Sequence, residues 1–175
     1  MMQPESTSLR RLDKSTIPGL VLIALWIAGS SLGLLAACRY GDAYASFLQP
    51  LAGFSPDLGG VFASAIFPLL LSACAAILFD AAGCYGICLL RGLGQGFFLG
   101  LARACFGMAA PLAVLLMGFS ALLVNGVLLF FWLRWLRMGI AGLREEFAAL
   151  FALCAGIGAV DYLLVGPFLA DVMNL

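Results

Sequence analysis

The stretch from residue 61 to residue 90 reads VFASAIFPLLLSACAAILFDAAGCYGICLL, and Asp80 is its one charged residue. As a single straight helix this stretch would be about 45 Å long, whereas the hydrocarbon core of a bilayer is roughly 30 Å thick. Asp80 is followed by two alanines and a glycine, which suit a tight turn. We therefore predict two membrane-spanning helices, over residues 61–79 and 82–102.

The composition of the whole chain leads to the same class of protein. Of its 175 residues, 64% are hydrophobic and 10% are charged, whereas an ordinary soluble domain is roughly half apolar and a quarter charged. A soluble fold of this size could not bury so much apolar surface. We predict an all-α polytopic membrane protein with a cytoplasmic basic arm over residues 1–16 and a single transmembrane domain over 17–175.

Three further apolar stretches complete a predicted bundle of about five transmembrane helices. They cover residues 17–38, 106–133 and 147–169, and the third of the five helices is the segment 82–102 named above. We expect a loop over residues 39–60, a kink at Pro111, and a second loop that contains the sequence RWLRMGIAGLREE. Fusing residues 61–90 into one helix would give four spans instead.

The orientation follows from the distribution of lysine and arginine, which are enriched in the cytoplasmic loops of membrane proteins. With five spans, six such residues lie on the side of the N-terminus and two on the other. The six are Arg10, Arg11, Lys14, Arg134, Arg137 and Arg144, and the two are Arg39 and Arg103. We therefore predict a cytoplasmic N-terminus and an exported C-terminus. A four-span arrangement would export the cluster around Arg134, so we reject it.

A stripe of small residues marks the third predicted span. Gly92, Gly96 and Gly100 recur at every fourth position, which places them on one face of a helix. Such stripes let two helix backbones approach closely in lipid. Gly94 is a further glycine between them, and so many glycines weaken a helix, so we expect a break, a kink or a re-entrant turn near Arg91.

Four polar residues are predicted to lie near the middle of the membrane. They are Arg91, Gln95, Asn125 and Asp161. Ionisable side chains at this depth are costly and usually face the bundle interior or a cavity. Arg91 and Asp161 are therefore expected either to form a structural ion pair or to belong to a proton or substrate site, and Asn125 to make a hydrogen bond between helices.

The sequence favours a protein without catalytic activity. It has no histidine, which is the commonest general base and the commonest metal ligand. Six cysteines lie in or near apolar stretches without metal-binding spacing, so we expect them to be buried thiols. A formal charge of zero argues against a nucleic-acid partner. No catalytic residue, metal site or cofactor is predicted.

The segment from Phe67 to Gly100 resembles stage II sporulation protein M and its relatives. The likeness lies in an apolar span, a small-residue break and an arginine–glycine turn before a glycine-rich helix. In this chain the turn corresponds to Arg91-Gly92-Leu93, and the aromatic residues follow at Phe97 and Phe98. The resemblance implies a non-enzymatic scaffold in the bacterial cytoplasmic membrane. It also implies cell-wall-facing partners, stage II sporulation proteins D and P, and a role in cell-wall remodelling during sporulation engulfment.

Two other functions remain open from the residues alone. A small transport subunit, such as the substrate-binding component of a vitamin importer, is of similar size, and Arg91, Gln95, Asn125 and Asp161 would line its midplane pocket. An intramembrane enzyme would have to rely on Asp80 and Asp161 as acids. No motif supports the enzyme.

Overall fold

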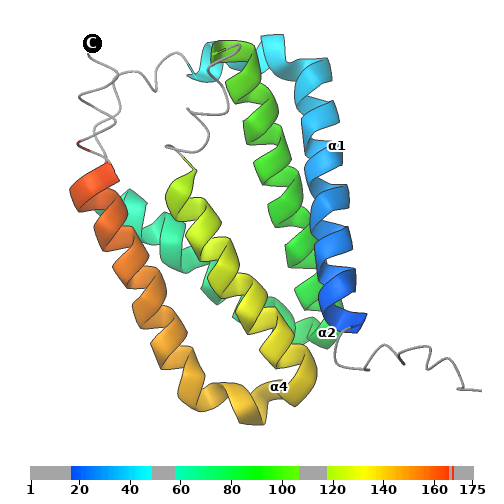
Figure 1. Cartoon of the computed structure of the whole chain (residues 1–175), viewed down its shortest axis with the longest axis vertical. Helices are drawn as coiled ribbons and strands as arrows, with labels where there is room; N and C mark the ends of the chain where they lie inside the picture. Colours follow the sequence, from blue (N-terminus) through cyan, green and yellow to red (C-terminus); the bar gives the residue numbers. More distant parts are fainter. Residues whose placement is uncertain (1–16, 49–57, 107–117, 166, 168–175) are drawn as a thin grey trace, which may run out of the picture.

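A computed structural model describes residues 17–48, 58–106, 118–165 and 167, and these residues form helices only. The order is α1 (Ile17–Leu48), α2 (Leu58–Phe106), α4 (Phe119–Val160) and a π-helical turn, η3 (Asp161–Val165). Figure 1 shows α1 beside the later part of α2, with α4 packed across the other side. The prediction of an all-α protein is confirmed for the described residues.

Two of the helices are sharply bent, and each bend reverses the direction of the chain. Asp80 interrupts α2 with φ 51° and ψ −129°, and Gly139 interrupts α4 with φ 61° and ψ −157°. Glycine adopts a positive φ at little cost, so the bend at Gly139 suits its residue. Asp80 has a Cβ atom and a ψ outside the left-handed helical region, so this conformation is strained and has to be held by the surrounding structure.

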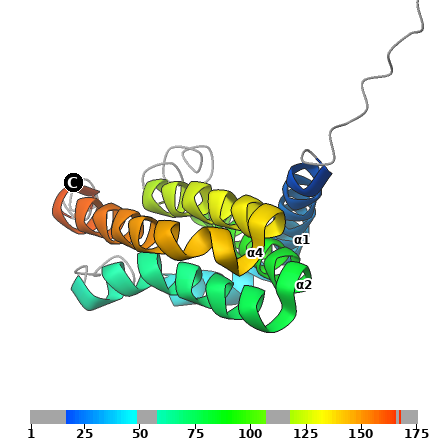
Figure 2. The same ribbon diagram turned by 90° about the horizontal axis from the view of Figure 1, so that it is seen from below.

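The bends and the start of α1 lie at the same end of the bundle, which we call the bend end (Figure 1). The opposite end holds the two termini of α2, the start of α4 and the turn η3. Asp80 divides α2 into a first arm, before it, and a second arm, after it, and Gly139 divides α4 in the same way. Seen from below, α4 lies over the first arm of α2, while α1 lies at the side against the second arm (Figure 2). Successive segments therefore run in alternating directions between the two ends.

Four stretches of the described residues are long and apolar enough to cross a membrane, one fewer than the five expected. They are Ile17–Tyr40, Leu58–Ala104, Phe119–Ile140 and Glu146–Val165. The difference lies in α2, which stays helical on both sides of Asp80 and so forms one stretch of 47 residues. The single residue at the bend replaces the short turn that we expected between two separate helices.

Several helices extend further than predicted. Helix α1 continues to Leu48 and α2 begins at Leu58, so the expected loop over 39–60 is wrong for residues 39–48 and 58–60. Helix α4 runs from Phe119 to Val160 with one bend at Gly139, so the basic segment 134–146 that we expected to be a loop is helical on both sides of that bend. Charged residues do not end a helix that has left the apolar region, because arginine and glutamate are good helix formers in water. The predicted kink at Pro111 lies outside the described residues.

The remaining predicted boundaries also shift. The last span, expected over 147–169, is α-helical to Val160 and then widens into η3. No break occurs near Arg91, since Asp80 is the position inside α2 with non-helical dihedral angles. Gly92, Gly96 and Gly100 are packed against α1, and this packing offsets the low helix propensity of the glycines in this part of α2.

The core lies mainly where α2 and α4 meet. Its largest fully buried side chains include Leu69, Leu128 and Phe131. Many large apolar side chains point outward instead, among them Leu78 at 72% and Phe79 at 66% exposure. In water this pattern would be unfavourable, but in a bilayer these side chains contact lipid. The distribution of apolar residues therefore suits a helical membrane protein.

Candidate functional site

Helices α1 and α2 meet through glycines on both sides of their interface. A Cβ atom built on Gly92 would lie 2.5 Å from the carbonyl oxygen of Trp26, and one on Gly96 would overlap the carbonyl oxygen of Ser30. In the reverse direction, a Cβ on Gly29 would overlap Leu89 and one on Gly33 would overlap Leu93. The two backbones are therefore in direct contact over successive turns.

The stripe predicted on α2 faces this interface along its whole length. Gly100, its last member, lies against Ala37, and a Cβ there would overlap the side chain of that alanine. Gly94 lies between the stripe positions, and a Cβ added to it would have nothing within 4 Å. The small residues of α1 at positions 29, 33 and 37 have the same spacing of four and complete a two-sided small-residue interface.

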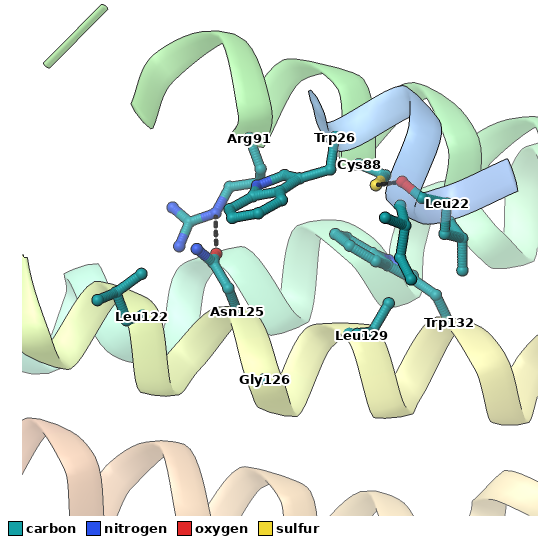
Figure 3. Close-up of a pocket in the computed structure, with 10 residues that line it drawn as sticks. Leu22, Trp26, Cys88, Arg91, Leu122, Asn125, Gly126, Leu129 and Trp132 are labelled. Atoms are coloured by element: carbon teal, nitrogen blue, oxygen red, sulfur yellow. Dashed lines mark hydrogen bonds between the residues drawn. The ribbon is translucent and has the colours of Figure 1, made fainter. Parts of the chain in front are cut away.

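This close approach brings polar side chains of different helices together. The indole Nε1 of Trp26 donates a hydrogen bond to Oε1 of Gln95, at 3.0 Å. The Nε of Arg91 donates to Oδ1 of Asn125 on α4, at 3.2 Å. Figure 3 shows Arg91 and Asn125 reaching toward one another across the gap between α2 and α4. Three of the four predicted midplane polar residues thus gather at one place.

Asp161 is not part of this cluster. It is the first residue of η3, at the end of α4 that lies away from the bend end. Within the described residues no ion pair joins Arg91 to Asp161, so the expected pairing between them is wrong. Arg91 instead contacts Asn125, which precedes the bend at Gly139, and no described residue that follows this bend lines the pocket beside Arg91.

A pocket of about 190 Å³ opens beside Arg91, between α1, α2 and α4. Its polar walls are Arg91 and Asn125, and its other walls are apolar or aromatic, including Trp26 and Trp132 (Figure 3). A second hollow, of about 430 Å³, also reaches Arg91 and is lined by Gln95, Phe98 and Gly118 among others. The guanidinium group therefore borders both spaces.

Two nitrogen atoms in the wall of the first pocket are buried without a hydrogen-bond partner in the described structure. They are Nδ2 of Asn125 and Nε1 of Trp132, and the side chain of Trp132 is only 3% exposed. A buried donor without a partner is unfavourable, and native proteins have few of them. Cys88 also lines this pocket, but its thiol already donates to the carbonyl oxygen of Leu22, at 3.3 Å.

Polar contacts of a different kind hold the bend end together. Nε1 of Trp135 donates to Oδ1 of Asp80, at 3.0 Å. Arg134 binds Glu146 through two hydrogen bonds, of 3.0 Å from Nε and 2.6 Å from Nη2, across the bend at Gly139. Both side chains of this pair are about one-third exposed, which suits a contact at the edge of a membrane. These contacts stabilise the bends and form no pocket.

Sequence reasoning missed the partner helix of the glycine stripe and the roles of the tryptophans. Gly29, Gly33 and Ala37 repeat at the same spacing as the stripe on α2, so this signal was present in the sequence. The hydrogen bonds of Trp26 and Trp135 had no such signal, because they join residues 69 and 55 positions apart.

Among the described cysteines, Cys84, Cys88 and Cys154 are buried, while Cys38 and Cys74 are exposed.

Comparison with known proteins adds no relative to this picture. No protein-family model, curated protein or solved structure matches the chain. Within the described residues there is also no group of three or more acidic or cysteine side chains placed to hold a metal ion.

Proposed function

We propose that this protein is a non-enzymatic integral membrane scaffold of the type that stage II sporulation protein M represents. In this proposal it resides in the bacterial cytoplasmic membrane and anchors cell-wall hydrolases on the outer side during sporulation engulfment. Its partners there are stage II sporulation proteins D and P. The resemblance over residues 67–100 motivates the partners and the process.

The observation that carries the scaffold proposal is the direct backbone contact between α1 and α2. Gly33 and Gly96 each lie where a single added carbon would overlap the opposite backbone, so the two helices are packed backbone to backbone at both positions. A transporter of the alternating-access type needs segments that move against one another. A scaffold needs a rigid platform, and this interface supports that requirement.

The proposed topology has five crossings, in which the two arms of α2 each cross once. Each arm is longer than the roughly 20 residues that a span requires. Arg134 and Arg137 precede the bend at Gly139 by five and two residues, and residues 10, 11 and 14 come before α1 in the sequence. The start of α1 lies at the bend end (Figure 1). The positive-inside rule therefore favours a cytoplasmic bend end and an exported C-terminus.

The proposal is tested in the host that encodes the chain. A strain that lacks the gene is complemented with the wild-type protein, with Gly96→Leu or with Gly94→Leu, and engulfment is followed with a membrane dye. Gly94 has open space around it and is the matched control for Gly96. We expect engulfment to stall in the deletion strain and with Gly96→Leu, and to proceed with Gly94→Leu.

Affinity purification of the tagged protein provides the second half of this test. We expect wall hydrolases to be recovered with the wild-type protein and with Gly94→Leu. A host that never engulfs a forespore, or a deletion strain that completes engulfment normally, would refute the sporulation role.

A small transport subunit is the second candidate, and the pocket beside Arg91 is the observation that favours it. Arg91 and Asn125 meet there from two helices, and Gln95 lines the second hollow that Arg91 also borders, as the residues of a midplane substrate site would. Co-purification with an ATPase pair in place of wall hydrolases would support this candidate over the scaffold.

A further inference from the structure

The guanidinium group of Arg91 has hydrogen-bonding capacity that the protein does not use. Its Nε donates to Asn125, while neither of its terminal Nη atoms has an acceptor among the described residues. Arginine keeps its charge in proteins, and a charge at this depth in a membrane protein normally has a partner. The protein thus holds a half-buried cation whose counter-charge is not supplied by the described part of the chain.

The other unused polar groups of the pocket are also donors. Nδ2 of Asn125 and Nε1 of Trp132 are buried and have no partner among the described residues. The side-chain oxygens nearby are already engaged, since Oδ1 of Asn125 accepts from Arg91 and Oε1 of Gln95 accepts from Trp26. A ligand that matches these groups must therefore present acceptors, and the charge of Arg91 selects an anion.

The remaining walls of the pocket define the rest of the ligand. Leu22 from α1, and Leu122 and Leu129 from α4, surround the polar groups with aliphatic surface (Figure 3), and Ile23 also lines the pocket. A volume of about 190 Å³ holds more than a single water molecule, which needs only about 10–15 Å³ of such space. The pocket therefore suits a small oxyanion that is attached to an apolar group.

We propose that this pocket binds the oxyanion of an amphiphile, a carboxylate or phosphate whose apolar chain lies against the leucines of α1 and α4. Arg91 binds the anion through its Nη atoms, and Trp132 and Asn125 donate to the remaining oxygens. Trp26 donates to Gln95, which lines the second hollow beside Arg91. This inference is independent of the scaffold function, because it concerns a ligand held within the bundle.

The test uses the full-length protein purified in an uncharged detergent. Octyl phosphate and octanoate are the probes, and octanol and octyltrimethylammonium are controls that share their chain but lack the anion. Inorganic phosphate tests whether a free oxyanion is sufficient. Binding is measured as the rise in melting temperature and as the change in tryptophan fluorescence, since two of the three tryptophans line the pocket.

Three variants identify the site. Arg91→Met should weaken binding of octyl phosphate by at least about tenfold, because it removes the charge-assisted hydrogen bonds. Trp132→Phe should weaken it by about twofold to tenfold, because it removes one neutral donor and keeps the aromatic ring. Arg103→Gln, which removes an exposed arginine at the end of α2, should leave binding unchanged. If Arg91→Met does not fold, two milder variants still test the site. Arg91→Lys keeps the positive charge but removes the guanidinium group, and Trp132→Phe keeps an aromatic ring but removes the donor.

The outcomes separate the possible sources of the anion. Stabilisation by octyl phosphate and octanoate, but not by inorganic phosphate, supports an amphiphile such as a membrane lipid. If inorganic phosphate raised the melting temperature as much as octyl phosphate does, the apolar part of the proposal would be overturned. The oxyanion site itself would be overturned if octanol and octyltrimethylammonium raised the melting temperature as much as octyl phosphate does. It would also be overturned if both Arg91→Lys and Trp132→Phe bound octyl phosphate as tightly as the wild-type protein.

Discussion

Trp135 donates its indole hydrogen to the carboxylate of Asp80 across 3.0 Å, and this bond joins the two positions where the bundle reverses direction. Asp80 is itself the bend residue of α2, and Trp135 lies one turn before the bend of α4 at Gly139. The residue that permits the first reversal therefore also anchors it to the second. This contact ties the two bends together at the same end of the molecule.

The three tryptophans provide a matched test of this contact. Trp135→Phe should lower the free energy of unfolding by about 1 kcal/mol, because it removes a donor that has a partner. Trp26→Phe should have a similar cost through Gln95. Trp132→Phe should be neutral or stabilising in the absence of ligand, because its donor has no partner among the described residues. Unfolding is followed in detergent by circular dichroism, and an equal cost for all three would contradict this ranking.

Glycine substitutions test the interface between α1 and α2. Gly96→Ala should destabilise the protein, since the added methyl group overlaps the backbone at Ser30. Gly94→Ala should instead stabilise it by up to about 1 kcal/mol, because alanine has the higher helix propensity and the position is open. The measurement is the melting temperature of each variant in detergent. If both variants shift it in the same direction, the stripe is not a close-packed interface.

The partner of Arg91 can be identified by double-mutant cycles. Arg91 and Asn125 are in contact, so their substitutions should be non-additive by about 0.5–3 kcal/mol. Arg91→Met and Asp161→Leu should be additive within about 0.5 kcal/mol, because the two residues do not meet. Coupling of Arg91 to Asp161 in place of Asn125 would restore the ion pair that the sequence suggested.

The pair at the second bend is expected to contribute little to stability. Arg134 and Glu146 form a bidentate salt bridge, but both side chains are about one-third exposed. Glu146→Gln should therefore cost less than about 1 kcal/mol, and the loss should shrink as salt is added. The comparison of unfolding at low and high ionic strength checks this expectation. A larger cost that salt does not change would place the pair in a protected environment.

Reporter fusions test the proposed topology. A reporter after Leu175 should be exported, whereas one inserted near Gly139 should remain in the cytoplasm, because basic residues are concentrated near that bend. An alkaline phosphatase and a green fluorescent protein fusion at each position give complementary signals. A cytoplasmic signal after Leu175 would require an even number of crossings, as in the four-span arrangement.

The sequence by itself determined the class of the protein and the position of its main reversal. An apolar stretch too long for one crossing, with a lone aspartate inside it, was sufficient to expect a turn at Asp80, and α2 bends there. The period of four in Gly92, Gly96 and Gly100 was sufficient to place these glycines on one face. Both inferences depend on local properties, namely hydropathy and helical periodicity.

Only the tertiary structure decided which residues meet. The stripe packs on α1, Arg91 contacts Asn125 and not Asp161, and the basic segment after Leu133 remains helical up to Gly139. These outcomes depend on how each helix is rotated and tilted against its neighbours. Rotation and tilt follow from side-chain packing summed over whole interfaces, so residues far apart in the chain set them together.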